Sequence, residues 1–234
     1  MRDPLVIAVA QPLCVSHDVA LNAVTHAATV RSAGARVVVF PELSLTGYEL
    51  DATAITADDP RLSPIVEACA EAEASALVGA PVQGEAGRSH IATLAVDGTG
   101  SRVAYRKMWL GAAESERFAP GDGPAVYDVD GWRLGLAICK DTGVAQHAAD
   151  TAALGIDAYV AGTVKSADEA ARQDERARRV ATDHRIWVAV ASFAGSTGGG
   201  YAEAAGRSGI WRSDGAAVTQ AGPETGAIAR ATLT

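Results

Sequence analysis

The chain has 234 residues, 48% of them hydrophobic and only 5% aromatic, so a sizeable core built largely from Ala, Val, Leu and Ile is expected. Its formal net charge is −8 at pH 7, and no run of Lys and Arg offsets it. Such a surface repels phosphate backbones, so we expect neither a nucleic-acid nor a membrane partner.

The cysteines and the N-terminus indicate the compartment. Cys14, Cys69 and Cys139 are odd in number and far apart, which argues against a disulfide framework or a zinc site and suits a reducing cytoplasm. The opening MRDPLVIAVAQP has too short an apolar run for a signal peptide, and no stretch is long enough to span a bilayer. We expect a soluble cytoplasmic protein with a single domain over residues 1–234.

Strand-like and helical patterns alternate in the first 80 residues. A helical apolar spacing ends at Gly34, a usual helix stop, and the following β-branched run fits a strand buried on both faces. The predicted elements are a strand at Leu5–Ala10, a helix at His17–Ala33, a strand at Arg36–Phe40, a helix at Arg61–Ala74 and a strand at Ala76–Ala80.

Three hairpins are predicted later in the chain, each from a short turn sequence between two strand-like runs. They are Ser89–Arg106 around Asp97-Gly98-Thr99-Gly100, Ala125–Val129 with Trp132–Ile138 around Asp130-Gly131, and Arg207–Arg212 with Ala216–Gln220 around Ser213-Asp214-Gly215. The segment from Lys107 to Gly123 is irregular.

Further helices and strands separate the last two hairpins. They are a helix at Gly143–Leu154, a strand at Ala158–Ala161, a helix at Asp168–His184, a strand at Ile186–Phe193 and a glycine loop at Ser196–Gly200, with a last strand at Ala227–Leu233. A doubly wound sheet would lack so many hairpins, so we predict an α/β protein with mixed sheets and outer helices.

Three reactive side chains share one position relative to the predicted strands. Glu42 follows Arg36–Phe40, Lys107 follows the strand-like run that ends at Arg106, and Cys139 follows Trp132–Ile138. Side chains beyond the carboxyl ends of neighbouring strands converge on one rim, where such sheets bind ligands. This placement predicts a shared site.

The combination suits nucleophilic catalysis. A neutral thiol needs a base or a field that favours thiolate, and Glu42 is the candidate base for Cys139. The positive end of a helix starting near Gly143 would help the thiolate. Lys107 and the backbone N–H of Lys140 could hold an oxyanion. Taken singly, each residue has a plainer interpretation. Cys139 is then a small hydrophobic residue, Glu42 belongs to a turn, and Lys107 is a solvated loop lysine.

Three motifs around these residues resemble the nitrilase (carbon–nitrogen hydrolase) superfamily. FPELSLTGY at Phe40–Tyr48 resembles its glutamate motif, YRKMWL at Tyr105–Leu110 its lysine motif, and GLAICKD at Gly135–Asp141 its cysteine motif. They stand in the family's order, 107 − 42 = 65 and 139 − 107 = 32 residues apart. VIAVAQP, ERFAPGD, ARRVATDHRIWVAVASFAG and GRSGIWRSDG extend the resemblance over nearly the whole chain.

The resemblance implies a four-layer αββα sandwich and a homodimer or higher homo-oligomer. It also implies that Glu42 is the general base, Lys107 the oxyanion stabiliser and Cys139 the nucleophile. A second glutamate often lies between the lysine and cysteine motifs. Glu114 fits that position best, and Glu116 is the competitor.

Candidate substrate-binding residues follow from the same resemblance and from its departures. Trp109 stands where histidine is common and either walls the pocket or packs in the core. Lys140 stands where many members have an aromatic residue, and either faces an acidic substrate or lies on the surface. Asp141 either caps the next helix or orders the site. The remaining candidates for the pocket are Tyr48, Thr163 and Val164.

We therefore predict an amidohydrolase acting on a small linear amide or carbamoyl compound through a thioester. Nitriles are less favoured, because nitrile-cleaving members typically follow the cysteine with Trp-Glu, and Lys140-Asp141 stands here. The alternatives are a non-catalytic binding protein that keeps the fold and a redox-sensing cysteine. No metal or organic cofactor is implied, since the histidines show no ligand spacing: His17, His26, His90, His147 and His184.

Overall fold

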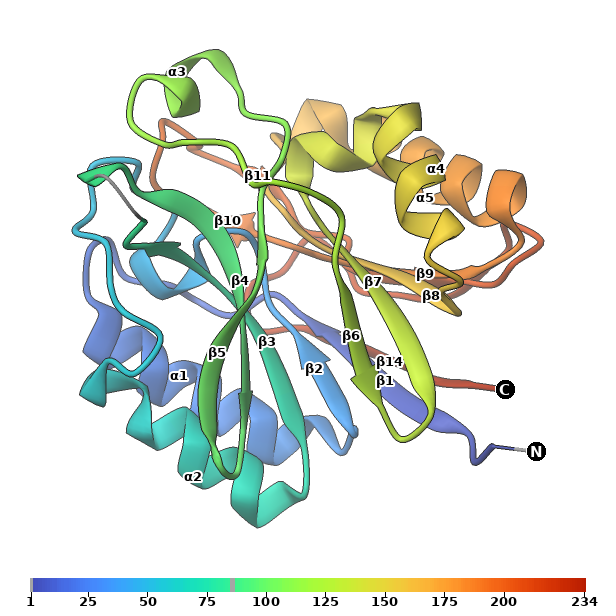
Figure 1. Ribbon diagram of the computed structural model, residues 1–234, viewed down its shortest axis with the longest axis horizontal. Coiled ribbons are helices and arrows are strands. Elements are labelled where there is room, and N and C mark those ends of the chain that lie inside the picture. The colour runs from blue at the N-terminus through green and yellow to red at the C-terminus, as the bar shows by residue number, and fades with distance from the viewer. Residues whose placement is uncertain (1, 85–86) are drawn as a thin grey trace.

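The computed structural model describes residues 2–84 and 87–234 and places most strands in two mixed sheets (Figure 1). The first sheet has the order β14 (Ile228–Leu233), β1 (Leu5–Ala10), β2 (Val37–Val39), β3 (Ser75–Val82), β4 (His90–Asp97), β5 (Gly100–Arg106). The second has the order β13 (Ala217–Gln220), β12 (Gly209–Trp211), β9 (Trp187–Ser192), β8 (Ala158–Thr163), β7 (Trp132–Ile138), β6 (Val126–Val129).

Parallel pairing occupies the centre of each sheet. Strands β1, β2 and β3 are parallel neighbours in the first sheet, as are β7, β8 and β9 in the second. The three predicted hairpins are confirmed as the antiparallel pairs β4–β5, β6–β7 and β12–β13. The last strand, β14, returns to pair antiparallel with β1 at the edge of the first sheet.

Helices cover the outer face of each sheet, which confirms the predicted αββα layers (Figure 1). Helices α1 (Val19–Ala33) and α2 (Ser63–Ala72) pack on the first sheet, and α4 (Ala145–Ala153) and α5 (Ala170–His184) on the second. A third apolar cluster fills the space between the sheets. The layers follow from alternating side chains: Ile7 and Val9 point to the inner cluster, and Ala8 and Ala10 to the helices.

Most boundary errors have a local cause. The first helix begins at Val19 rather than His17, because the Asp18 carboxylate caps it by accepting from Leu21 N at 3.0 Å. The second begins at Ser63, after a 3₁₀ turn η2 at Pro60–Leu62. The third begins at Ala145, after a 3₁₀ turn η4 at Cys139–Gly143.

Some elements were not predicted. A short helix α3 (Ala112–Ser115) lies within the segment predicted as irregular, and 3₁₀ turns η1 (Ser44–Thr46) and η5 (Ala167–Glu169) follow β2 and β8. Strands β10 (Ala194–Gly195) and β11 (Ala204–Ala205) form a two-stranded sheet around the predicted glycine loop. Figure 1 shows α3, β10 and β11 at the upper end of the sandwich.

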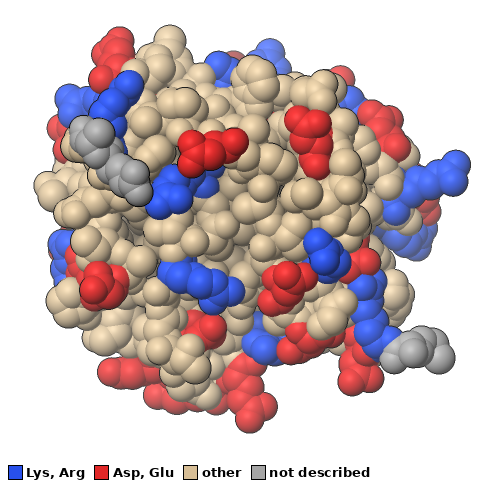
Figure 2. All heavy atoms as spheres, viewed as in Figure 1, with Lys and Arg blue, Asp and Glu red and all other residues tan. Residues whose placement is uncertain are grey.

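Surface charge is relevant to nucleic-acid binding, and the length and polarity of the helices are relevant to membrane insertion. Basic and acidic side chains are interspersed on the face in Figure 2, with acidic groups gathered along its lower margin, where α2 lies in Figure 1. Every helix within residues 2–84 and 87–234 is too short or too polar to cross a membrane.

Candidate active site

Four side chains from three connecting segments meet in one buried group, which we name the catalytic cluster: Glu42, Lys107, Glu114 and Cys139. The Lys107 ammonium donates to Glu42 Oε1 at 2.6 Å and to both oxygens of Glu114, at 2.7 and 2.8 Å. The four residues are between 1 and 7% exposed. The convergence expected from the strand ends is therefore present for Glu42 and Lys107, with a second carboxylate on the same ammonium.

Glu42 is held on a tight turn after β2 by two glycines. Leu43, directly after it, has a left-handed backbone with φ 51°. Gly79 in β3 and Gly162 in β8 lie on either side of the turn, and a Cβ at either one would clash with its backbone. A glycine inside a strand often marks such a close backbone approach, so these two residues carried a sequence signal that we did not use.

Cys139 lies at a sharp bend between β7 and the 3₁₀ turn η4. Its φ of 42° is left-handed, which costs a non-glycine residue roughly 1–2 kcal/mol. The sulfur donates to the carbonyl of Val164, the residue after β8, at 3.4 Å. Backbone strain of this kind is found where surrounding contacts hold a reactive side chain in place.

The second carboxylate of the site is Glu114 rather than Glu116. Glu114 lies on α3, where its Oε2 also accepts from Gly111 N at 2.6 Å and its Oε1 from the Tyr48 hydroxyl at 3.3 Å. Glu116 is exposed. The sequence favoured Glu114 over Glu116 for this position, and the folded loop turns Glu114 inward.

Burial dominates the electrostatics of the catalytic cluster. Burial raises the pKa of Glu42 to about 7, with the Lys107 charge opposing the shift and Glu114 adding to it. Burial lowers the pKa of Lys107, but the neighbouring acidic groups, the carboxylates of Glu42 and Glu114 among them, outweigh it, so the pKa is raised and the ammonium stays charged. Glu42 Oε2 has no hydrogen-bond partner among the described residues.

The thiol of Cys139 is protonated in the resting protein. Burial, with a smaller contribution from Glu42, raises its pKa to about 11, and Lys107 and Lys165 oppose the rise. The helix expected to begin near Gly143 is α4, which begins at Ala145, and its help to the thiolate stays a prediction. Reaction at the sulfur therefore requires a neighbouring base.

A second buried polar group lies beside the first, and we name it the anchor cluster: Tyr105, Asp141, His147 and Tyr159. Asp141 Oδ2 accepts from the Tyr105 hydroxyl at 2.7 Å and from Ile138 N at 2.9 Å. The Tyr105 hydroxyl and His147 Nε2 are 2.9 Å apart, as are His147 Nδ1 and the Tyr159 hydroxyl.

The anchor cluster joins the loops that carry Lys107 and Cys139. Asp141 Oδ1 accepts from Trp109 N at 2.9 Å, two residues after Lys107, while Oδ2 bonds Ile138 N, directly before Cys139. Asp141 is fully buried in the 3₁₀ turn η4 and thus orders the site instead of capping α4. Sequence reasoning missed its three partners, whose spacing in the chain gave no signal.

The predicted substrate-binding residues lie at different depths. Tyr48 and Val164 are buried in contact with the catalytic cluster, through the Tyr48 hydroxyl and the Val164 carbonyl. Thr163 ends β8 rather than following it, and its hydroxyl bonds Gln173 Oε1 and Ala191 O. Its side chain is thus engaged away from Cys139.

The other two predicted binding residues are exposed. Trp109 is 42% exposed, so the interpretation that it packs in the core is wrong. The ammonium of Lys140 donates to Leu110 O at 2.5 Å, which ties the lysine to the loop after Lys107. Both side chains therefore lie around the loop that follows Lys107.

An open cavity of about 580 Å³ lies at the opposite end of the sheets, beside the starts of β2 and β3 and the end of β6. Two charged pairs lie in its lining, with Arg36 bonding Asp130 at 2.8 Å and Arg102 lying 3.7 Å from Asp97, and the Tyr127 hydroxyl bonds Ser75 at 2.8 Å. The catalytic cluster is enclosed and separate from it.

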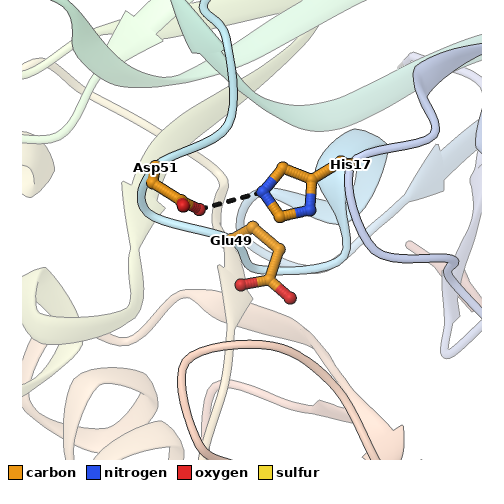
Figure 3. Close-up of side chains that lie close together, drawn as sticks. All are labelled: His17, Glu49 and Asp51. Carbon is orange, nitrogen blue, oxygen red and sulfur yellow. Dashed lines mark hydrogen bonds and ion pairs between the residues drawn. The ribbon is translucent and has the colours of Figure 1, made fainter.

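His17 shows no ligand spacing in the sequence, but folding brings it beside Glu49 and Asp51 (Figure 3). The three side chains are at the surface. His17 Nε2 lies 2.9 Å from Asp51 Oδ1, and the Ser16 hydroxyl bonds His17 Nδ1 and Glu49 Oε1 at 2.8 and 2.7 Å. Because both ring nitrogens have protein partners, hydrogen bonding accounts for the group.

A sequence model of the family described as "Carbon-nitrogen hydrolase" matches residues 7–234. A Pseudomonas protegens protein described as "Hydrolase in pqqF 5'region" is 28% identical over 179 residues. That match covers 73% of this chain and 62% of the relative, so the chain spans less than two thirds of the relative's length.

Two solved structures share the fold. One is a mutant of the amidase from Nesterenkonia sp. AN1 that shows covalent addition of the acetamide moiety of fluoroacetamide at its active-site cysteine. It has a TM-score of 0.86 and 22% identity and covers 98% of this chain and 90% of that one. The other is Nit3 of Saccharomyces cerevisiae, a member of branch 10 of the nitrilase superfamily. Its TM-score is 0.85, with 21% identity over 98% of this chain and 90% of that one.

Proposed function

The chain belongs to the carbon–nitrogen hydrolase family, and on that premise we propose that it hydrolyses the C–N bond of a small linear amide or N-carbamoyl compound. The observation that carries the proposal is one buried ammonium, Lys107, bonded to two carboxylates and close enough to Cys139 for their charges to shift each other's pKa. Burying charged groups in this way costs free energy of folding. Their presence despite that cost indicates a functional site.

The first step is attack by the sulfur. Glu42 takes the thiol proton on its unpaired Oε2 as the sulfur bonds to the amide carbon, and the carbonyl π electrons move onto oxygen. The Lys107 ammonium and the backbone N–H of Lys140 stabilise that oxyanion. A pKa of about 7 lets Glu42 accept and release a proton near neutral pH.

Two further proton transfers complete the cycle. Glu42 returns its proton to the leaving nitrogen as the C–N bond breaks, which releases ammonia or an amine and leaves a thioester on Cys139. Glu42 then deprotonates a water that attacks the thioester, and the acid product leaves as the sulfur regains its proton. Glu114 keeps Lys107 oriented throughout, since it holds the ammonium through both oxygens.

The decisive experiment is ammonia release from a panel of short linear amides, N-carbamoyl compounds and nitriles, with wild type compared to Cys139→Ala. We expect turnover by wild type only, on amides or carbamoyl compounds, and a mass increase on Cys139 when a substrate is trapped. Equal background rates from both proteins would leave a non-catalytic binding protein as the better interpretation, and turnover of nitriles alone would select the nitrile-cleaving alternative.

Redox sensing by Cys139 is the weaker alternative. Oxidation follows thiolate character and exposure, and this thiol is buried with its pKa raised to about 11. The trapped-substrate measurement separates the two functions, because a redox sensor would gain oxygen from peroxide and no acyl group from an amide.

We further propose that the chain forms one domain over residues 1–234, works in a reducing cytoplasm, and assembles as a homodimer or larger homo-oligomer. All three cysteines are free, which fits a reducing compartment. Sedimentation of the purified protein tests the assembly, and a monomer at micromolar concentration would contradict it.

A further inference from the structure

Lysine is rare in this chain, and its few occurrences lie around one site. Only three of the 20 basic residues are lysines, namely Lys107, Lys140 and Lys165, and the other 17 are arginines. Lys107 belongs to the catalytic cluster, and Lys140 follows Cys139 and is bonded to Leu110 O. Lys165 has no role in the proposed chemistry.

The backbone places Lys165 beside the reactive sulfur. It directly follows Val164, whose carbonyl accepts from Cys139 Sγ at 3.4 Å. Its own carbonyl accepts from Ala205 N at 2.8 Å, and Ser166 pairs with Ala204 in an antiparallel bridge. The segment that carries Lys165 is therefore fixed on both sides, by Cys139 and by β11.

The Lys165 ammonium has no acidic partner in the part of the chain that the structure describes. The side chain is half-buried, and within residues 2–84 and 87–234 no carboxylate lies within ion-pair distance of it. Glu169 is an acidic neighbour on the following turn, but it pairs with Arg172 at 2.6 Å and accepts from the Ser166 hydroxyl at 3.4 Å. A half-buried ammonium that none of these carboxylates engages is available to bind an anion from outside.

Tyr201 lies on the loop that leads into β11. Its ring packs edge-on against Tyr48 with centroids 5.5 Å apart, and Tyr48 bonds Glu114. Burial raises the pKa of Tyr201 to about 12, and charges on Cys139 and Glu42 add to the shift, so its hydroxyl is within electrostatic reach of the catalytic cluster. The positive charge of Lys165 likewise lowers the pKa of Cys139. Both side chains thus act on the space next to the sulfur.

We propose that Lys165 binds a carboxylate at the far end of the substrate, so that the preferred substrates are monoamides of short dicarboxylic acids or carbamoyl compounds bearing an acid group. This inference rests on the proposed function. It transfers to Lys165 the role in acidic-substrate binding that the sequence suggested for Lys140, whose ammonium is already bonded. A local cation also explains how a chain of net charge −8 can admit an anion.

The test compares amides that differ only in the terminal group. Glutaric acid monoamide is paired with pentanamide, and succinic acid monoamide with butanamide, in each case a carboxylate against a methyl group. We expect wild type to favour the acids at least tenfold in kcat/KM, and Lys165→Met to lower that ratio about tenfold or more, chiefly through KM. Lys165→Arg should keep most of the preference.

The ratio isolates binding from reactivity. Loss of the Lys165 charge also raises the pKa of the Cys139 thiol, but that effect is shared by both members of a pair and cancels in their ratio. Lys140→Met is the matched control for loss of a lysine beside Cys139, and its ratio should stay within about twofold of wild type. An equal fall of the ratio in both lysine variants would overturn the proposal, as would no preference in wild type.

A binding measurement keeps this inference separate from the proposed function. Calorimetry on Cys139→Ala should show that glutaric acid monoamide binds at least about tenfold more tightly than pentanamide, and that Lys165→Met removes the difference. If wild type hydrolyses none of the amides but this binding pattern holds, the hydrolase proposal fails and the anion site stands. If neutral amides are hydrolysed and binding ignores Lys165, only the anion site fails.

Discussion

Two buried polar clusters flank the bend at Cys139, and they differ in how completely their atoms are paired. In the catalytic cluster, Glu42 Oε2 has no hydrogen-bond partner among the described residues, and the Cys139 sulfur has one bond, 3.4 Å long. In the anchor cluster, both Asp141 oxygens, both His147 nitrogens and both tyrosine hydroxyls are engaged.

The difference separates reactivity from rigidity. A buried polar atom without a partner costs about 1–3 kcal/mol, so an unpaired carboxylate oxygen beside a thiol is a proton acceptor held at the expense of stability. A fully paired network instead fixes one geometry. Because Asp141 bonds the backbone at Ile138 and at Trp109, the stable cluster holds in position the loops on which the reactive one depends.

The largest effect is expected from a substitution in the catalytic cluster. Glu42→Gln removes the base while keeping its shape, and turnover should fall about 100- to 10,000-fold. In wild type, kcat/KM should rise with pH through about 7, since the base must be deprotonated. Amide hydrolysis measured from pH 5 to 9 checks both, with the exposed Glu116→Gln as a control that keeps the wild-type profile.

The same substitution should stabilise the fold at high pH. The folded protein keeps the Glu42 proton up to about pH 7, whereas the unfolded chain releases it near 4.5. The wild-type free energy of unfolding therefore falls as pH rises from about 4.5 to 7 and stays lower above that. Glu42→Gln avoids this loss, so urea unfolding should show it more stable than wild type at pH 8, on the order of a few kcal/mol, and similar at pH 4.5. Lower stability at pH 8 would contradict an unfavourably buried carboxylate.

The next largest effect is expected from a substitution in the anchor cluster. Asp141→Asn replaces one acceptor oxygen by an NH₂ group, which can only donate. Because the Tyr105 hydroxyl and the backbone N–H groups of Ile138 and Trp109 all donate to Asp141, at least one of these hydrogen bonds must be lost. The substitution also removes the negative charge. We expect a loss of about 3 kcal/mol in the free energy of unfolding, and a smaller fall in turnover by the folded fraction. Thermal and urea unfolding measure the first, and kcat on the surviving protein the second.

Asp150→Asn is the matched control, an exposed carboxylate on α4 that accepts from Gln146 at 2.8 Å. Its stability should change by less than about 0.5 kcal/mol. If Asp141→Asn were no more costly than this control, the anchor cluster would not be a structural support. If it abolished turnover without loss of stability, Asp141 would belong to the chemistry itself.

The sequence predicted the reactive cluster better than the rigid one, for a physical reason. Glu42, Lys107 and Cys139 each follow a strand at the same end of the sheets, so strand ends alone bring them together. The layers were predicted as well, because alternating apolar residues assign each strand two covered faces. Such patterns are local, and each can be read from a few neighbouring residues.

The anchor cluster and the anion site depend on contacts that no local pattern encodes. His147 meets Tyr105 from 42 residues away, and only the packing of α4 on the second sheet brings them together. Glu114 fitted the second-carboxylate position better than Glu116 by sequence, but only the fold of α3 shows which of the two turns inward. Lys165 follows a strand whose end was predicted two residues too early, so its approach to Cys139 through Val164 could not be foreseen.

The smallest expected effect sharpens the comparison at the edge of the catalytic cluster. Tyr48→Phe removes a 3.3 Å bond to Glu114, which stays bound to Lys107 through both oxygens and to Gly111 N. The loss should therefore be about 0.5–1.5 kcal/mol, a two- to tenfold fall in kcat/KM, with the ring contacts to Phe193 and Tyr201 retained.

Steady-state kinetics measure that fall, and Tyr127→Phe supplies the control, because its hydroxyl bonds Ser75 at the opposite end of the sheets. A change in turnover as large as that of Glu42→Gln would mean that the Tyr48 hydroxyl contacts the reacting atoms. A fall confined to this small range would instead mean that Lys107 is oriented mainly by its three carboxylate contacts. The reactive cluster would then tolerate loss of an outer bond because its charges, rather than its full set of hydrogen bonds, hold it together.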